Sequence, residues 1–226
     1  DTMFLAWQEI KKYKLRFTLI MGILMLVSYL VFFLSGLATG LADLNREAVD
    51  KWEATSIVLT SESDKSLSQS SLSMNDVEYI QAEETAVLGQ LNAIANNGDS
   101  KQNIALFGIN EDEFLMPEVE SGEEFQQANE VIADDSLKEE GFEIGDTVTL
   151  SSSDQEVTIV GFTTDSRFNA APVLYTDLST FQELKFGEAA EQNDDQINAL
   201  VIRDASINSI DNEEFELIEI ESFIES

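Results

Sequence analysis

The sequence predicts an α+β extracellular domain carried on one N-terminal transmembrane helix, which a short amphipathic helix precedes. Residues 17–42 contain no charged side chain, whereas residues 43–226 alternate short strand-like runs with short capped segments typical of helices. The charge is divided in the same way: four basic and two acidic residues give +2 over 1–42, while eight basic and forty-two acidic residues give −34 over 43–226. The two parts are therefore expected to meet different surroundings.

The uncharged run is long enough to cross a membrane. A helix rises about 1.5 Å per residue, so residues 17–42 reach roughly 39 Å, and about 20 apolar residues suffice to cross the hydrocarbon core. The basic cluster KKYKLR precedes the run, and Asp43, Glu47 and Asp50 follow it. The positive-inside rule therefore predicts a cytoplasmic N-terminus and an extracellular location for residues 43–226.

Residues 3–16 predict a cytoplasmic amphipathic helix on the inner leaflet. Apolar side chains recur there at roughly helical spacing, with Trp7 and Tyr13 at headgroup level. A cleaved signal peptide is the alternative, because Gly40-Leu41-Ala42 resembles a cleavage site of small residues. We favour an uncleaved anchor, since the apolar run is longer than the hydrophobic region of a signal peptide and the preceding residues have a pattern of their own.

The acidic part, residues 43–226, is long enough to bury a core. Acidic residues around Gly122 predict a boundary near 118–127 if the domain has two lobes. Strands are expected at 56–59, 86–91, 104–108, 147–150, 156–162, 172–175, 199–202 and 215–218. Short helices are expected after the N-cap Ser73, over 134–140, over 177–184 and over 206–210.

Composition excludes several classes of function. A net charge of −32 argues against nucleic acid as a partner, because a polyanion is bound through clustered Lys and Arg. With no Cys and no His, disulfides, zinc sites, thiol catalysis and His-dependent catalysis are ruled out. The sequence contains neither the spacing of acidic residues that forms a calcium-binding loop nor the phosphate-binding motif GxxxxGK[ST]. We therefore predict no catalytic residue, no metal site and no enzyme activity in this chain.

Three segments, in order, resemble the first part of an FtsX/MacB-like ABC transporter permease. The middle one carries a GxxxGD turn before a strand, and the last carries a VxIVG strand followed by PxxY. They are MFLAWQEIKKYKLRFTLIMGILMLVSYLVFFLSGLATGL (3–41), EVIA (130–133) with GFEIGDTVTL (141–150), and VTIVGF (157–162) with NAAPVLY (169–175). Within the family, the chain most resembles the heme (hemin) exporter permeases of Gram-positive bacteria.

The resemblance implies a fold, partners and a cargo. Residues 3–16 correspond to the family's elbow helix, 17–42 to its first transmembrane helix and 43–226 to a MacB-like periplasmic core. The family pattern continues with three more membrane helices, so we expect this chain to be part of a longer permease. The expected partners are a cytoplasmic ABC ATPase subunit, a second permease copy in a homodimer and the lipid bilayer. Heme is expected as the transported substrate, not as a permanently bound cofactor.

Candidate site residues follow from the chemistry of heme iron. Without His or Cys, only Tyr, Met or a carboxylate can contact the iron. Each candidate also has a structural alternative, either packing in the core or facing lipid or solvent. The candidates are Met25, Tyr29 and Phe33 on the span, Glu47 beyond its outer end, and Tyr175 in the third segment; Gly36 and Gly40 form a GxxxG motif for helix packing.

Two other functions remain open at the level of sequence. Some members of the family transmit force to cell-wall enzymes or respond to peptides, so an FtsX-like interaction module is one alternative. A MacB-like exporter of peptides or antibiotics is the other. A heme titration separates heme export from both.

Overall fold

The computed structural model describes residues 13–225 of the chain. The amphipathic helix expected over 3–16 lies almost entirely outside the described residues, so its prediction is untested. The chain divides into two compact units, Asp1–Asp43 and Leu44–Ser226, and each is described by itself.

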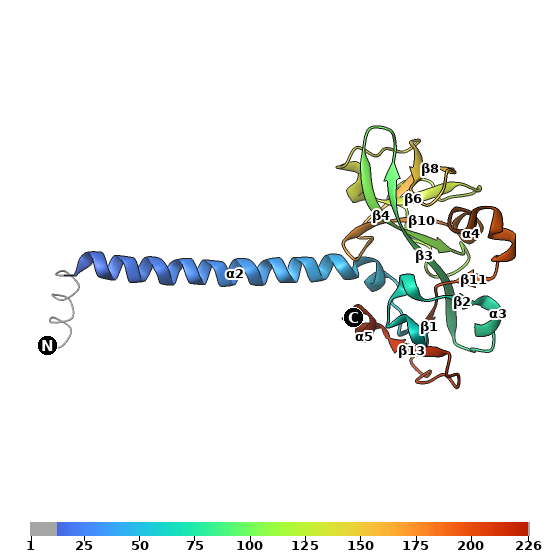
Figure 1. The fold of residues 1–226 in the computed structure, drawn as a ribbon, viewed down its shortest axis with the longest axis horizontal. Helices are drawn as coiled ribbons and strands as arrows, with labels where there is room; N and C mark the ends of the chain where they lie inside the picture. Colours follow the sequence, from blue (N-terminus) through green and yellow to red (C-terminus); the bar gives the residue numbers. More distant parts are fainter. Residues whose placement is uncertain (1–12, 226) are drawn as a thin grey trace. The chain divides into compact units, whose positions relative to one another are not determined.

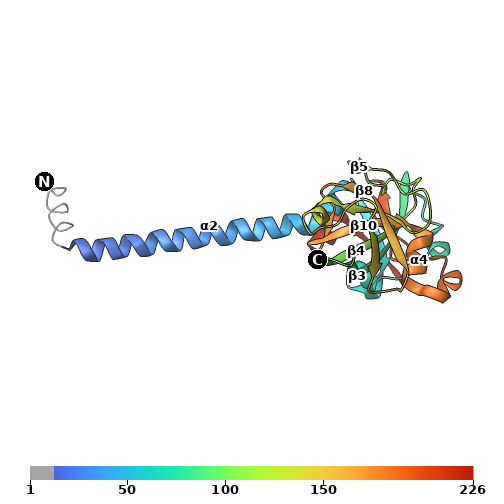
Figure 2. The same ribbon diagram turned by 90° about the horizontal axis from the view of Figure 1, so that it is seen from above.

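One helix, α2 (Lys14–Lys51), contains the whole uncharged run. Figures 1 and 2 draw it without interruption, which fits a segment with no proline. Its most apolar window has a mean hydropathy of 2.5, and none of that window is buried within the chain. The helix is therefore long and apolar enough to span a membrane, where lipid would cover the side chains that the protein leaves exposed.

The second unit is a mixed domain of many strands and few, short helices. Its long strands are β1 (Ser56–Thr60), β3 (Glu84–Asn96), β4 (Lys101–Ile109), β6 (Glu130–Asp134), β7 (Thr147–Leu150), β8 (Glu156–Thr163), β10 (Ala171–Asp177), β12 (Ala199–Arg203) and β13 (Phe215–Glu219). Two-residue strands are β2 (Leu72–Ser73), β5 (Ser121–Gly122), β9 (Arg167–Phe168) and β11 (Gln196–Ile197). Helices are α3 (Met74–Val77), α4 (Leu178–Phe186), α5 (Ile220–Ile224) and the 3-10 turns η1 (Ser61–Ser63), η2 (Leu67–Gln69), η3 (Asp135–Lys138) and η4 (Gly187–Gln192).

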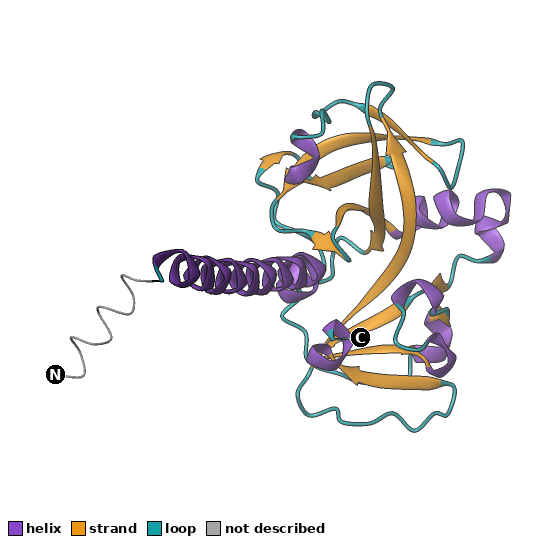
Figure 3. Ribbon diagram, turned by 60° about the vertical axis from the view of Figure 1, so that its left-hand side comes forward, coloured by secondary structure: helices purple, strands orange, loops and turns teal. Residues whose placement is uncertain are grey.

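Strand β3 belongs to two groups of strands. Its first part, up to Leu88, pairs with β12, which continues through β1 to β13 in antiparallel order. From Gly89 onward β3 pairs instead with β4. The second group closes on itself, because β4 pairs with β10, β10 with β6, β6 with β8, β8 with β7 and β7 with β3. Figure 3 shows the long strand passing from the open group into this small closed barrel.

Both faces of the central barrel strands are buried. In β10, Leu174 belongs to one apolar cluster, whereas Val173 and Tyr175 belong to a second cluster on the opposite face. In β4, Leu106 and Phe107 divide between the clusters in the same way. Successive side chains of a strand point to opposite faces, so these strands read as continuous apolar runs in the sequence.

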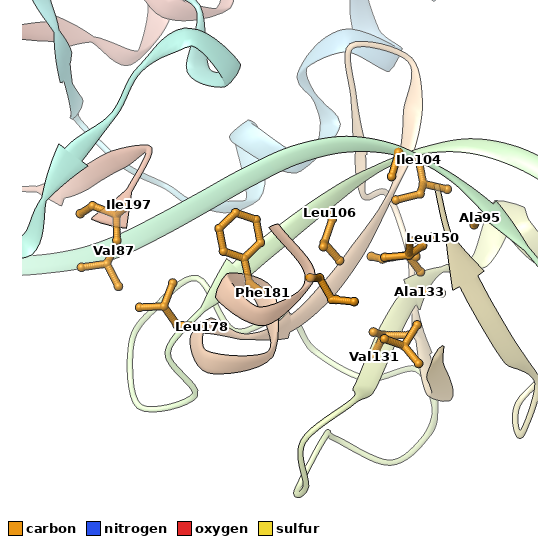
Figure 4. Packing of buried hydrophobic residues seen from close by; sticks show 14 of the residues in the cluster. Val87, Ala95, Ile104, Leu106, Val131, Ala133, Leu150, Leu178, Phe181 and Ile197 are labelled. Carbon is orange, nitrogen blue, oxygen red and sulfur yellow. The ribbon is translucent and has the colours of Figure 1, made fainter. Parts of the chain in front are cut away.

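Helix α4 packs against the point where β3 changes partners. Asp177 caps the helix by accepting a hydrogen bond from the Thr180 N–H at 3.0 Å. Phe181, on its first turns, lies over the paired glycines Gly89 and Gly108, where a Cβ would stand 2.3 and 2.4 Å from the ring atoms. Figure 4 shows Phe181 among the buried side chains of the first cluster. Only glycine at these two positions lets the ring approach the strands so closely.

The structure confirms the α+β fold class and all eight expected strands. The helix expected after Ser73 is present as α3, and the one over 177–184 as α4. A 3-10 helix, Asp135–Lys138, replaces the α-helix expected over 134–140. The helix expected over 206–210 is wrong: residues 205–206 form a turn and 207–210 have no regular structure. In that turn the Asp204 carboxylate accepts hydrogen bonds from the Ser206 N–H and hydroxyl.

The sequence placed a lobe boundary near 118–127. In the structure Ser121 and Gly122 form β5 and pair with β8, inside the barrel group. The change from one strand group to the other lies at Leu88 and Gly89.

We predict that Gly108→Ala lowers the free energy of unfolding by about 1–3 kcal/mol, because the new methyl group overlaps the Phe181 ring. Urea unfolding followed by near-UV circular dichroism measures the change. Gly22→Ala is the control, since a Cβ at Gly22 meets nothing within 4 Å. Gly89→Ala tests the same ring in a double variant. In a Phe181→Leu background it should cost less, because leucine lacks the Cε1 and Cζ atoms that a Cβ at Gly89 would meet at 2.3 and 2.8 Å; equal costs in both backgrounds would contradict the close-packing explanation.

Candidate functional site

Tyr175, a predicted iron ligand, lies in β10 with only 2% of its surface exposed. Its hydroxyl donates to Ser166 Oγ at 3.3 Å, and burial raises the pKa of the phenol to about 12. The side chain is therefore neutral near pH 7, and its oxygen points to a protein partner. As an iron-binding phenolate, Tyr175 would have to leave Ser166 and lose its proton.

An aromatic cluster surrounds Tyr175. The ring of Phe107 meets Tyr175 edge-on, with centroids 5.7 Å apart and planes at 87°. Phe107 also contacts Phe168 and Trp52, at 5.5 and 6.2 Å between centroids. Phe168 in turn stacks on Phe223 of α5 at 6.4 Å. These rings hold together the residue that follows α2, strands β4, β9 and β10, and helix α5.

Glu47, the second predicted ligand outside the span, is half-buried on the last turns of α2, beyond the uncharged run. Burial raises the pKa of its carboxyl group above the ordinary value. The Arg167 guanidinium opposes this shift, as does a hydrogen bond from the Arg167 backbone, whereas the carboxylates of Asp134 and Asp165 add to it. Glu47 is thus a carboxyl group that binds a proton more readily than an exposed glutamate does.

A chain of contacts connects Tyr175 with Glu47. Ser166, the partner of the Tyr175 hydroxyl, donates its N–H to Asp134 Oδ1 at 2.8 Å. Asp134 is 1% exposed, and its Oδ2 lies 3.9 Å from Arg167 Nε. Arg167 then faces Glu47. The structure therefore brings two residues that are 128 positions apart, 175 − 47, to the two ends of one polar network.

The remaining candidates lie along one side of α2. Met25, Tyr29 and Phe33 are four residues apart, a spacing that places them on the same helix face. They are 77%, 66% and 54% exposed, and the rings of Tyr29 and Phe33 stack with centroids 6.1 Å apart. Gly36 and Gly40 continue this face, and a Cβ at either would meet nothing within 4 Å. The face is available to lipid, a neighbouring helix or a ligand.

A cavity of about 410 Å³ lies beside Tyr175. Arg203 places its guanidinium carbon 4.2 Å from the centroid of the Phe114 ring, and its Nε donates to the Trp52 carbonyl at 2.7 Å. The buried Trp52 Nε1 has no hydrogen-bond partner within residues 13–225. The lining includes Lys51, Trp52, Phe114, Met116, Tyr175 and Arg203. Glu53 and Glu118 line the same cavity, so its two cations are matched by two carboxylates. The aromatic rings and the thioether offer surface to a flat apolar molecule.

A family comparison matches residues 17–213 to the MacB-like periplasmic core domain. The chain belongs to the MacB-like periplasmic core domain family. This result confirms the resemblance inferred from the three sequence segments.

Proteins named hemin transport system permease protein HrtB, from Staphylococcus haemolyticus and Staphylococcus epidermidis, are 29% identical to this MacB-like chain over 185 residues. The matched region covers 80% of this chain and 52% and 51% of those relatives. The chain thus spans about half the length of the curated relatives it matches.

Two solved structures have the same fold at low sequence identity. The extracellular domain of the ABC-type transporter YknZ from Gram-positive bacteria aligns with a TM-score of 0.52 and 13% identity, covering 73% of this chain and 99% of that one. The periplasmic region of MacB from Actinobacillus actinomycetemcomitans aligns with a TM-score of 0.54 and 14% identity, covering 76% of this chain and 91% of that one. These likenesses support the MacB-like fold.

The sequence analysis missed the groups that connect Glu47 with Tyr175. One available signal was Arg167, because residues 43–226 contain only eight basic side chains among forty-two acidic ones. A scarce cation in an acidic domain is expected to have a structural partner. Asp134 also carried a signal, since it ends a buried strand and caps the next turn, but its contact with the segment at Ser166 depends on tertiary structure.

We predict that Glu47→Gln raises the melting temperature of the MacB-like domain at pH 7. The pKa of Glu47 is higher in the folded state than its ordinary value of 4.5, so the protonated form of Glu47 stabilises the fold. This contribution is complete below pH 4.5 and is lost as the pH rises through the pKa of the folded state. Gln mimics the protonated form, so the gain should disappear near pH 4. Thermal melts across pH 4–8 test this, with the exposed Glu140→Gln as control; an equal gain at both ends of the range would refute it.

Proposed function

We propose that this chain is the N-terminal part of the permease subunit of an ABC efflux transporter that exports heme. The observation that carries the proposal is the 29% identity over 185 residues to proteins named for hemin transport. The membership of the MacB-like family supports a permease rather than an enzyme. In this proposal ATP is hydrolysed by a separate cytoplasmic subunit, and a second permease copy completes the transporter.

The charge pattern supports the orientation proposed for the chain. Lys11, Lys12, Lys14 and Arg16 precede the apolar run, whereas the following domain is strongly acidic. This pattern favours a cytoplasmic N-terminus, with the domain outside the cell. Movement caused by ATP hydrolysis would then reach the domain through α2, whose last turns carry the buried residues Ala48 and Val49.

Heme contacts are proposed at two places that differ in accessibility. On α2, the exposed face with Met25, Tyr29 and Phe33 offers a thioether, a phenol and an aromatic ring to a porphyrin in the outer leaflet. On the domain, the cavity beside Tyr175 offers aromatic surface to the porphyrin. Its cations Lys51 and Arg203 are the proposed partners of the propionate groups, beside the lining carboxylates Glu53 and Glu118. Glu47 lies between these places in sequence and offers a carboxylate.

We predict that hemin titrated into the detergent-solubilised chain shifts its Soret band and that Tyr175→Phe weakens the interaction about tenfold if the phenol ligates iron. Met25→Leu and Glu47→Gln test the other ligands in the same assay. Tyr79→Phe is the matched control, because Tyr79 is 51% exposed and outside both proposed contacts.

If the three variants Tyr175→Phe, Met25→Leu and Glu47→Gln show the same Soret shift as the control Tyr79→Phe, none of the three side chains ligates the heme iron. Absence of any shift, together with binding to a cell-wall hydrolase or a peptide, would support an interaction module or a peptide exporter in place of heme export. In full-length protein with its ATPase, loss of heme tolerance in the same variants would connect binding with transport.

We predict that single cysteines distinguish the two membrane orientations directly, since the chain contains no cysteine of its own. Ser152→Cys in the exposed turn after β7 should react with a membrane-impermeant maleimide in intact cells, whereas Thr2→Cys should react only after permeabilisation. The reverse pattern would overturn the proposed topology. Ser100→Cys, in the turn between β3 and β4, provides a second reporter on the domain.

A further inference from the structure

The turn between β3 and β4 contains the one Asn-Gly pair of the sequence, Asn97-Gly98. Figure 1 shows this turn, in green, at the top of the barrel. Gly98 is exposed and has a φ of 100°, and Asn97 is half-buried. An asparagine is chemically labile when the next residue has no side chain, because the backbone nitrogen of that residue can then approach the carboxamide closely.

The Asn97 carboxamide joins the turn to a second segment of the barrel. Its Nδ2 donates to the Gly141 carbonyl at 2.9 Å and to Asp146 Oδ2 at 3.0 Å. Its Oδ1 accepts from the N–H groups of Asp99 and Ser100 at 3.1 and 2.8 Å. These four bonds fix the tip of the hairpin against the segment that precedes β7.

Deamidation of Asn97 begins when the Gly98 nitrogen attacks the carboxamide. The nitrogen loses its proton and forms a bond to Asn97 Cγ, the Cγ–Nδ2 bond breaks, and Nδ2 leaves as ammonia with that proton. Water then opens the cyclic imide and gives aspartate or isoaspartate and a proton. The only reactant that the protein does not supply is water, which reaches the exposed turn.

The folded turn keeps the nucleophile hydrogen-bonded. The Gly98 N–H donates to Asn96 Oδ1 at 2.9 Å, and loss of its proton would break this bond. Departure of Nδ2 would also take both donors away from Gly141 and Asp146. The two N–H groups at Oδ1 would stabilise the oxyanion of the intermediate, but only after the nucleophile is free. Opening of the hairpin tip releases the nucleophile and the carboxamide together.

We propose that Asn97 is a latent deamidation site: the folded turn protects it, and deamidation in the opened turn prevents the same contacts from forming again. The product has a carboxylate in place of the amide, so both donors are lost. The new negative charge faces the Asp146 carboxylate and the Gly141 carbonyl. Because the ammonia is lost, the tip of the barrel stays loosened.

The chain contains an internal reference for this reaction, Asn208-Ser209. Both residues are exposed and lie in the stretch 207–210, which has no regular structure. The Asn208 side chain donates one long bond, of 3.5 Å, to the Ser206 carbonyl. A serine obstructs the backbone nitrogen more than a glycine does, so Asn97 should react faster than Asn208 in the unfolded chain.

The test is incubation of the detergent-solubilised chain at mildly alkaline pH, with peptide mass spectrometry measuring the conversion of amide to acid at both sites. Relative to the chain unfolded in guanidinium chloride, we expect folding to slow the reaction at Asn97 at least about tenfold and to slow Asn208 much less. A similar Asn97 rate in both states, or an equal decrease at both sites, would overturn the proposal.

Variants test whether the hydrogen bonds of the turn protect the site. Asn96→Ala removes the acceptor of the Gly98 N–H and should raise the folded-state rate at Asn97 about tenfold. Asp146→Ala removes one acceptor of Nδ2 and should also raise it. Asn103→Ala, at an exposed asparagine of β4, is the matched control. Near-UV circular dichroism checks that each variant is folded, and unaltered rates in both turn variants would contradict the protection.

Asn97→Asp reproduces one product of the reaction directly. Without the two donors, backbone hydrogen exchange in 97–100 and 141–146 should be at least about tenfold faster than in the unmodified chain. Asn96→Asp is the matched control, because it adds the same charge while its side-chain oxygen still accepts from Gly98. Exchange as slow in Asn97→Asp as in the control would show that deamidation does not loosen the tip. These experiments do not depend on the cargo of the transporter.

Discussion

Backbone hydrogen bonding along β3 connects the two strand groups of the domain. One strand supplies a pairing edge to β12 up to Leu88 and to β4 from Gly89 onward. Asn198 reinforces the change of partner, because its N–H donates to the Leu88 carbonyl and its side-chain oxygen accepts from the Gln90 N–H. Since these groups are buried, breaking the arrangement would leave several polar atoms without partners. The positions of the barrel and of α4 follow from this single strand.

The aromatic cluster has a complementary role at the end of α2. Trp52, at 2% exposure, packs on Phe107, which in turn contacts Tyr175 and Phe168. Nearby, the Arg167 guanidinium lies between the carboxyl groups of Asp134 and Glu47. Burial is the main cause of the raised pKa of Glu47, and the Asp134 carboxylate adds to it, whereas the Arg167 guanidinium opposes it. The same region therefore combines dense apolar packing with a titratable group, directly after the segment proposed to cross the membrane.

The strong negative charge is mostly a property of the domain surface. Most of its carboxylates are on exposed turns, while the few cations have specific structural contacts. Lys138 lies 4.7 Å from the centroid of the Phe162 ring, and Lys185 donates to Asn198 Oδ1 at 3.2 Å. Burial lowers the pKa of Lys185, since desolvation disfavours its charged form. The structural role of each basic residue in this acidic domain therefore depends on the side chains that surround it.

Local sequence determined much of this protein. The long apolar helix, eight strands and the caps at Ser73 and Asp177 follow from hydropathy, residue spacing and short-range hydrogen bonds. The helix expected over 206–210 was wrong, since the bond from the Ser206 N–H to the Asp204 carboxylate closes a turn there. Local sequence does not separate the two outcomes, because the same bond is typical of both a helix N-cap and an isolated turn. Tertiary structure alone decided that β3 serves two groups and that Glu47 and Tyr175 share a polar network. Each of these depends on contacts between segments far apart in sequence, which no local spacing encodes.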